Sequence, residues 1–344
     1  MNIDRRNESL ATYYRPKEFE DCVGQTSIIK ILERQVATQT YKHVYLFNGP
    51  SGCGKTTIAR ILASKINGSL AGLEELDAAS NNGVDNVRDI IAGAMERSVS
   101  AKYKIFIIDE CHALSNQAWQ AFLKCIEEPP EYTIFMFCTT DPQKIPATIL
   151  NRCQRYNLTK IGADKIKERL KYICECEHFI NYEESIDYIS KICDGGARDA
   201  IATLEKVSSL GDNLTIENTL EALGNYSYDM MFSLANAIID GNINYIVETI
   251  NNIYYSGNDL KFFVDQFFTF CIDITKYCLF KSMSILSVPA SFESKLQDST
   301  NFDSPEKYYM HIVDSLRTLK NEIKNESSIK SVIEASFIKM GRWE

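Results

Sequence analysis

The segment 49–56 reads GPSGCGKT and fits the pattern G-x-x-x-x-G-K-[ST]. Glycines in this pattern let backbone N–H groups curl around a phosphate chain, and the N-terminus of a following helix attracts negative charge. Lys55 would reach the β- and γ-phosphates, and the Thr56 hydroxyl would bind Mg²⁺. The segment lies between a strand-like run, 44–47, and a helical stretch, 57–66. This placement favours a nucleotide site over a Gly-rich turn. We expect further contacts from Gly49, Ser51, Gly52, Cys53, Gly54 and Thr57.

Two carboxylates, Asp109 and Glu110, follow the apolar run 105–108. Ligands of an open α/β sheet bind at the carboxyl ends of its strands, so this pair is expected beside the phosphates. Asp109 suits the Mg²⁺ shell, and Glu110 suits polarising the attacking water. The alternative is a solvated turn or a helix cap. The presence of the phosphate loop in the same chain favours the catalytic interpretation.

A hydroxyl group, that of Thr140, follows a third apolar run, 133–138. It could hydrogen-bond the γ-phosphate or the attacking water. A threonine that ends a strand often has no such role, and the spacing alone does not decide between the two interpretations.

The elements that must position these groups alternate along residues 1–160. The runs 44–47, 105–108 and 133–138 are short, apolar without alternation, and rich in β-branched or aromatic residues. Such runs are typical of strands buried on both faces of a parallel sheet. A further strand near 75–78 has a weaker pattern. Amphipathic helical stretches separate the runs, so an α/β fold with a parallel sheet is predicted.

Beyond residue 160 the strand pattern stops and helical spacing takes over. We predict three domains: an α/β core at 1–160, a small helical lid at 161–223, and an all-α domain at 224–344. Gly241 and Gly257 are expected to interrupt helices of the last domain. The helices expected in the lid lie at 165–176, 183–192, 200–210 and 216–223.

The composition excludes several classes of protein. The chain has 344 residues, of which 45% are hydrophobic, and no apolar run reaches the roughly 18 residues that a membrane-spanning helix needs. The N-terminus lacks the apolar core of a secretory signal. Eleven cysteines are scattered without a C-x-x-C pair, and only four histidines are present, so no zinc spacing emerges. We expect a cytoplasmic protein with reduced thiols.

Motifs in a fixed order give the chain a family resemblance over residues 13 to about 205. It resembles the clamp-loader branch of the AAA+ ATPases. The matching segments are 14–25, 49–56, 77–80, 109–115, 124–130, 139–146, 151–153 and 196–200.

The resemblance implies roles for individual residues. Val23 lies in the box that holds the adenine, and Thr140 aligns with the first sensor. Arg198 aligns with the second sensor, which links the helical lid to the γ-phosphate. Arg152 corresponds to the arginine of the family's S-R-C motif, although Asn151 replaces the serine. That arginine reaches a neighbouring subunit's ATP, which makes hydrolysis depend on assembly. Ordinary ion pairs are the alternative for both arginines.

Zinc is not implied. Bacterial members of the family carry a four-cysteine module after the phosphate-loop helix, whereas the segment 65–76 is short and has no cysteine.

The net charge of −9 argues against DNA at first sight, but the charge is unevenly distributed. Residues 1–160 hold 19 basic and 18 acidic residues, a net of +1, whereas residues 161–344 hold 18 and 28, a net of −10. In the family, basic residues inside the subunit spiral follow the DNA backbone, and Arg88 and Lys124 match two such positions. For Lys124 a solvated helix face is the alternative.

The resemblance therefore implies an ATPase motor subunit that uses ATP and Mg²⁺ to open a sliding clamp and load it on primer–template DNA. The implied partners are other loader subunits in a pentameric ring or spiral, the clamp, DNA without sequence preference, and a DNA polymerase. A helicase loader or branch-migration motor is one alternative. A subunit that binds nucleotide without hydrolysing it is another.

Overall fold

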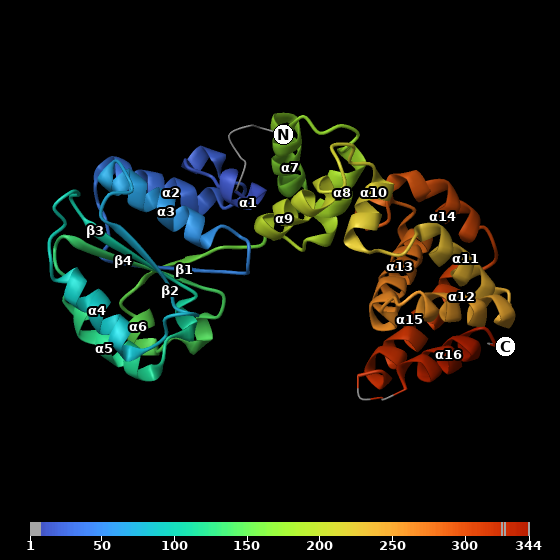
Figure 1. Cartoon of the computed structure of the whole chain (residues 1–344). Helices are drawn as coiled ribbons and strands as arrows, with labels where there is room; N and C mark the ends of the chain where they lie inside the picture. Colours follow the sequence, from blue (N-terminus) through green and yellow to red (C-terminus); the bar gives the residue numbers. More distant parts are fainter. Residues whose placement is uncertain (1–7, 325, 327, 343–344) are drawn as a thin grey trace. The chain divides into compact units, whose positions relative to one another are not determined.

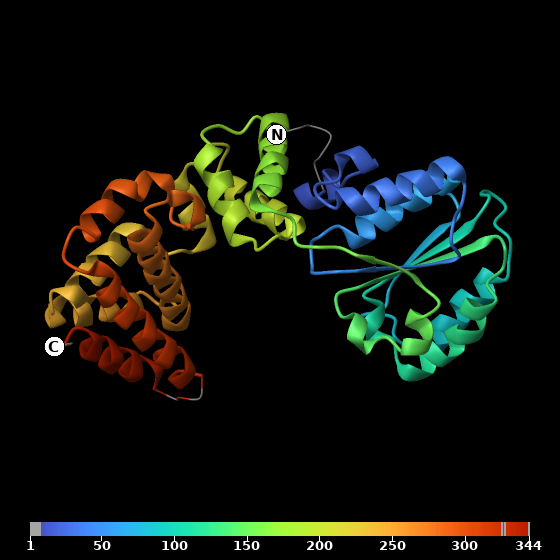
Figure 2. The same ribbon diagram turned by 180° about the vertical axis from the view of Figure 1, so that it is seen from behind.

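The computed structural model describes residues 8–324, 326 and 328–342 (Figures 1 and 2). The chain forms two compact units. Unit 1 comprises Met1–Glu177 together with Cys193–Glu205, and unit 2 comprises His178–Ile192 together with Lys206–Glu344. The chain therefore leaves unit 1 and returns to it once. The predicted boundaries at 160 and 223 stay predictions.

A parallel sheet forms the centre of unit 1. Among the described residues it has five strands in the order β2-β3-β4-β1-β5, and every pair of neighbours is parallel. The predicted α/β fold is confirmed: three strands lie where apolar runs indicated them, and a fourth, β2, lies near the weaker pattern at 75–78. The strands are β1 (Val44–Asn48), β2 (Leu73–Asp77), β3 (Lys104–Asp109), β4 (Thr133–Thr139) and β5 (Gln154–Asn157).

Two layers of helices cover the sheet (Figure 1). Side chains of β1 alternate between them: Tyr45 and Phe47 pack in the apolar cluster of α2 and α3, and Val44 and Leu46 pack in that of α4 and α5. Burial on both faces explains why the central strands are apolar throughout. The helices of these layers are α2 (Thr26–Thr38) and α3 (Lys55–Asn67) on one face, and α4 (Val84–Ala94), α5 (Asn116–Glu127) and α6 (Ala147–Leu150) on the other.

The carboxyl ends of the central strands meet at one edge of the sheet. Asn48 of β1 pairs in register with Thr139 of β4, and Asp77 of β2 pairs with Asp109 of β3. The loop after β1, the carboxylates at the end of β3 and the threonines at the end of β4 are thereby brought to the same edge, as the sequence predicted.

Four helices follow the sheet, at the positions that helical spacing indicated. They are α7 (Ala163–Glu177), α8 (Glu183–Ile192), α9 (Ala197–Ser208) and α10 (Ile216–Leu223). The third begins three residues before its predicted start at 200, so that Arg198 lies in its first turn. Its N-terminal part, through Glu205, belongs to unit 1.

The remaining helices of unit 2 share one apolar core. Gly241 and Gly257 interrupt them, as predicted, and both have a positive φ, 68° and 75°. None of the helices in the described part of the chain combines the length and apolar character needed to cross a membrane. The helices are α11 (Tyr228–Ile239), α12 (Ile243–Tyr255), α13 (Leu260–Phe280), α14 (Glu293–Ser299), α15 (Pro305–Glu322) and α16 (Ile329–Met340).

Short helical turns complete the description. They are α1 (Leu10–Tyr13) and the 3₁₀ turns η2 (Phe19–Asp21), η3 (Cys111–Ala113), η4 (Pro142–Lys144), η5 (Met283–Ile285) and η6 (Ala290–Phe292).

Candidate nucleotide site

The phosphate loop joins β1 to α3. Lys55, the first residue of α3, has a side chain that is almost fully buried, and its ammonium donates hydrogen bonds to the carbonyl oxygens of Gly49 (3.0 Å) and Pro50 (2.9 Å). Gly54 precedes the helix with a φ of 100°, a conformation that residues with a Cβ rarely adopt. The loop therefore holds Lys55 at the helix N-terminus, where anions are favoured.

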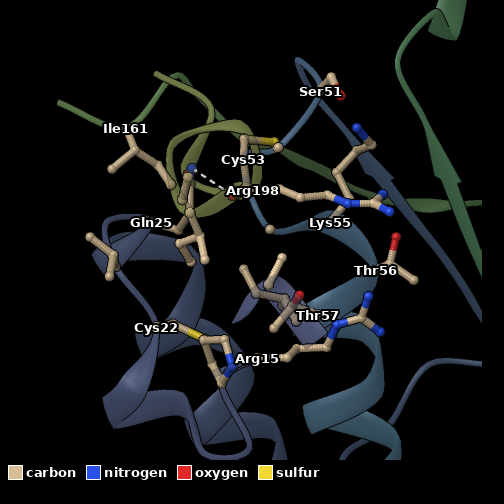
Figure 3. Close-up of a pocket in the computed structure, with 18 of the residues that line it drawn as sticks. Arg15, Cys22, Gln25, Ser51, Cys53, Lys55, Thr56, Thr57, Ile161 and Arg198 are labelled. Carbon is tan, nitrogen blue, oxygen red and sulfur yellow. Dashed lines mark hydrogen bonds between the residues drawn. The ribbon is translucent and has the colours of Figure 1, made fainter. Parts of the chain in front are cut away.

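Gly52 brings the start of α9 against the phosphate loop. It has a φ of 70°, and a Cβ added to it would lie 2.9 Å from the Cα of Gly196. The N–H of Ala197 donates to the carbonyl oxygen of Gly52 (3.1 Å). This close backbone approach places Arg198, the next residue, among those that line the cavity over the loop (Figure 3).

Thr56 and Asp109 offer oxygen ligands at one point. The Thr56 hydroxyl donates to Asp109 Oδ2 (2.7 Å), and Asp109 Oδ1 accepts the backbone N–H of Glu110 (3.0 Å). Hydroxyl and carboxylate oxygens are the ligands that Mg²⁺ prefers, and the ion commonly bridges such residues and substrate phosphates. The predicted donor set therefore fits a magnesium ion.

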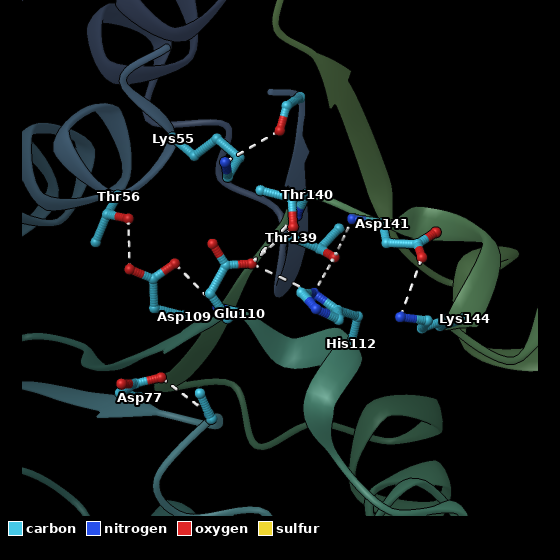
Figure 4. Close-up of polar contacts among 12 residues, drawn as sticks. Lys55, Thr56, Asp77, Asp109, Glu110, His112, Thr139, Thr140, Asp141 and Lys144 are labelled. Carbon is cyan, nitrogen blue, oxygen red and sulfur yellow. Dashed lines mark hydrogen bonds and ion pairs between the residues drawn. The ribbon is translucent and has the colours of Figure 1, made fainter. Parts of the chain in front are cut away.

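Glu110 is held by the strand end next to it (Figure 4). Its Oε2 accepts hydrogen bonds from the backbone N–H (3.3 Å) and the hydroxyl (3.1 Å) of Thr140, and it lies 3.3 Å from Nδ1 of His112. The backbone of Glu110 is left-handed, with a φ of 44°. A positive φ in a residue with a side chain is a strained conformation that is common at functional sites.

An apolar recess adjoins the loop within a cavity of about 180 Å³. Gln25 fixes its wall: its side-chain amide donates to the carbonyl oxygens of Thr159 (2.7 Å) and Cys53 (3.4 Å), and its Oε1 accepts the N–H of Thr159 (3.2 Å). Val23, which the family resemblance assigned to the adenine box, lines the cavity. Further apolar lining comes from Ala11, Pro16, Cys22, Ile161 and Ile201 (Figure 3).

Most of the predicted site residues meet in this cavity. Val23, Ser51, Gly52, Cys53, Gly54, Lys55, Thr56, Thr57, Asp109, Glu110 and Arg198 line it. Gly49 contributes a carbonyl oxygen to Lys55, and Thr140 contacts Glu110. The roles assigned to these residues stay predictions.

Arg15 is a cavity residue to which sequence reasoning assigned no role. Burial and the neighbouring guanidinium of Arg60 lower its pKa, and Arg198 acts in the same direction, whereas Glu75 and Asp109 oppose the change. A half-buried cation beside other cations is suited to binding an anion. Arg15 belongs to the Y-R-P segment that carried the family resemblance, and that segment was the signal available for it.

The thiols around the site are buried, and their surroundings disfavour the thiolate. Burial raises the pKa of Cys53, Cys111 and Cys138. Thiols with a raised pKa stay protonated and unreactive near neutral pH. Within the described residues, no cluster of three or more His, Cys, Asp or Glu side chains could hold a metal ion.

Arg152 does not line the cavity of its own chain. Its Nη2 lies 2.5 Å from Oε1 of Glu127 at the end of α5, and its Nη1 donates to the carbonyl oxygen of Thr148 (2.6 Å). The side chain is 37% exposed. The structure thus has the surface ion pair that was the alternative interpretation, and the guanidinium is still accessible from outside.

The two predicted DNA contacts lie on adjacent helices. Arg88 of α4 pairs with Asp85 (2.9 Å), and it lines a groove with Gln117 and Gln120 of α5. Lys124 follows Gln120 by one turn on α5, and it is exposed. Both basic residues are therefore available to a polyanion.

The family model that matches the chain is described as "DNA polymerase III, delta subunit", and it matches residues 74–162. This segment includes β3, β4, β5 and all of β2 except its first residue, and thus the two carboxylates and Arg152.

Curated relatives match a larger part of the chain. DNA polymerase III subunit tau of Bacillus subtilis is 38% identical over 286 residues, which are 76% of this chain and 51% of that protein. DNA polymerase III subunit gamma/tau of Mycoplasma genitalium is 28% identical over 331 residues, 90% of this chain and 55% of that protein. The chain spans about half the length of these relatives. They confirm the resemblance that the motifs indicated.

Among solved structures, the fold is similar to that of the RuvB Holliday junction branch migration motor of Thermotoga maritima. The TM-score is 0.52 at 20% identity, covering 66% of this chain and 80% of that one. This likeness concerns the fold alone, and it agrees with the α/β architecture that the sequence predicted.

Proposed function

We propose that this relative of the bacterial DNA polymerase III tau and gamma/tau subunits is an ATPase motor subunit of a clamp loader. The observation that carries the proposal is the convergence of Lys55, Thr56, Asp109, Glu110 and Arg198 in or around one cavity. These residues supply the parts that phosphoryl transfer to water requires: cations for the phosphates, a metal site and a carboxylate for the water.

Each residue has a separate task in the proposed reaction. Lys55 binds the β- and γ-phosphates, and Arg198 contacts the γ-phosphate from the start of α9. Thr56 and Asp109 would hold Mg²⁺, which would neutralise charge on the phosphate oxygens. Glu110 orients the attacking water and accepts its proton.

Arg152 acts on the site of a neighbouring subunit in this proposal. Its position outside its own cavity and its partial exposure support a role in trans. A guanidinium delivered by a neighbour neutralises charge in the transition state, so that hydrolysis depends on assembly. The partners that follow are further loader subunits in a pentameric ring or spiral.

The remaining partners are primer–template DNA, a sliding clamp and a DNA polymerase, acting in the cytoplasm. The groove between α4 and α5, with Arg88 and Lys124, would follow the phosphate backbone of the DNA without reading its sequence. The net charge of +1 over residues 1–160 leaves room for such a local basic surface. A branch-migration motor is less well supported, because the likeness to RuvB extends to the fold alone.

The test is an ATPase assay of the assembly that the purified chain forms with its partner subunits. Primed DNA and the cognate clamp should together raise turnover severalfold over that of the assembly alone. Unchanged turnover would exclude the clamp-loader mechanism and leave only a nucleotide site. Stimulation by four-way DNA junctions instead of primed DNA and clamp would favour a branch-migration motor.

A further inference from the structure

The two oxygens of the Glu110 carboxylate have different surroundings. Oε2 lies within hydrogen-bond distance of the Thr140 N–H (3.3 Å), the Thr140 hydroxyl (3.1 Å) and His112 Nδ1 (3.3 Å). Oε1 makes no hydrogen bond to any residue in the described part of the chain. One oxygen is therefore held by the protein and the other is left for a water molecule.

The hydrogen bonds around His112 determine which ring nitrogen carries the proton. Nδ1 also lies 3.1 Å from the hydroxyl oxygen of Thr139, and that oxygen accepts the N–H of Asp141 (3.0 Å). An unprotonated Nδ1 would turn its lone pair toward the Glu110 carboxylate, which is unfavourable. A protonated Nδ1 donates to the Thr139 hydroxyl and turns its N–H toward the carboxylate oxygen 3.3 Å away; Figure 4 draws both contacts.

We propose that His112 is a positioning residue for Glu110. The imidazole places Nδ1–H 3.3 Å from Oε2 and, together with the two Thr140 hydrogen bonds, fixes the carboxylate so that Oε1 faces the attacking water. The role rests on the proposed function, because it requires Glu110 to act on water at this site. His112 itself does not line the nucleotide cavity, so it acts only through Glu110.

The geometry explains why Glu110 needs such a partner. A glutamate side chain has three rotatable bonds, and this one is 35% exposed and begins from a left-handed backbone. Thr140, at the end of the neighbouring strand, donates to the carboxylate, and His112 of η3 contacts it at 3.3 Å, so the carboxylate is held from two directions. Fixing a reacting group in its working orientation lowers the barrier of the reaction.

The test compares three variants of the full chain in its assembly. His112→Phe keeps a ring and removes the donor, whereas His112→Asn keeps an N–H near the position of Nδ1. His43→Phe is the matched control, because Nδ1 of His43 contacts the carbonyl oxygen of Thr133 (2.9 Å) at the opposite end of the same strand, β4. All three leave the phosphate and magnesium ligands unchanged.

We expect His112→Phe to lower kcat about tenfold while the dissociation constant for ATP stays the same, since the lost polar contact is to a charged group. His112→Asn should restore kcat to within about threefold, and His43→Phe should leave it unchanged. Equal kcat values for His112→Phe and His43→Phe would overturn the proposal, as would an Asn variant no better than the Phe variant. ATP affinity, measured on the same preparations, shows whether each variant is folded.

A fourth variant separates this inference from the proposed function. Glu110→Gln should abolish turnover and preserve ATP binding. Wild-type turnover in Glu110→Gln would refute the proposed hydrolytic role itself. Loss of turnover in Glu110→Gln, with normal turnover in His112→Phe, would refute the role of His112 alone.

Discussion

Replacing Gly52 by alanine should separate the lid helix α9 from the phosphate loop. The new Cβ would lie 2.9 Å from the Cα of Gly196 and 3.3 Å from its carbonyl carbon. Both contacts are to backbone, which cannot rotate away as a flexible side chain can. The first residues of α9, with Arg198, must therefore shift, or the loop must.

Alanine at Gly52 has two costs, a strained backbone and a steric contact, whereas alanine at Gly68 has only the first and serves as the control. Gly68, just after α3, has a φ of 73°, close to the 70° of Gly52, but a Cβ at Gly68 would meet nothing within 4 Å. Alanine at either position costs about 1–2 kcal/mol for the left-handed backbone. At Gly52 the forced contact adds about 1–3 kcal/mol. ATP affinity should fall at least about tenfold in Gly52→Ala and stay unchanged in Gly68→Ala.

Urea unfolding and ATP titration measure these two quantities. Trp119, buried in the core of unit 1, reports that unit by fluorescence once Trp343, which lies outside the described residues, is replaced by phenylalanine. The free energy of unfolding should fall by about 2–5 kcal/mol in Gly52→Ala and by about 1–2 kcal/mol in Gly68→Ala. Equal losses of stability together with equal ATP affinities would refute the close approach of loop and lid.

Three other predictions follow from the surroundings of single side chains. Arg152→Ala should lower DNA- and clamp-stimulated turnover about a thousandfold without weakening ATP binding. Glu127→Gln should lower the same turnover only about two- to fivefold, because the ion pair between Arg152 and Glu127 is half-exposed. Loss of ATP binding in Arg152→Ala would mean that Arg152 acts in cis. Arg15→Ala should weaken ATP binding about tenfold in a titration, since the guanidinium lines the cavity, and unchanged affinity would exclude it from the site. Burial raises the pKa of Cys22 and Cys153 to about 12, so iodoacetamide at pH 8 should label these thiols only after the chain unfolds. The folded state should also lose stability as the pH rises above about 9, because the thiols ionise in the unfolded chain before they ionise in the folded one. Rapid labelling of the folded chain would contradict this.

The strands with a strong sequence pattern and the one that sequence reasoning missed differ in burial, whereas the edge strand β2 had only a weak pattern. β1, β3 and β4 are central strands, and their continuous apolar runs reflect burial on both faces. β5 lies at the edge of the sheet, and Tyr156 is its only buried residue. A strand with one buried side chain has no apolar run to detect, so the local pattern could not reveal it.

The site residues likewise divide into those that a local sequence pattern predicts and those that it does not. The phosphate loop and the two carboxylates could be predicted because each is a local pattern placed by a strand. The pairing of Gly52 with Gly196 joins distant segments, and no local spacing indicates it. His112 lies two residues from Glu110 in the sequence, but its contact with Thr139 depends on the sheet register, which brings the end of β4 beside η3.

The path of the chain through unit 1 determines which fragments can retain a complete nucleotide site. The segment Cys193–Glu205 belongs to unit 1 although α8, before it, belongs to unit 2. A fragment that stops at residue 160 keeps the phosphate loop but loses Gly196 and Arg198, both of which contribute to the site. The shortest N-terminal fragment with every cavity residue therefore extends past Ile201 and carries α8 with it. Limited proteolysis between 178 and 192 would leave Gly196, Arg198 and Ile201 attached to the rest of unit 1 only through non-covalent contacts.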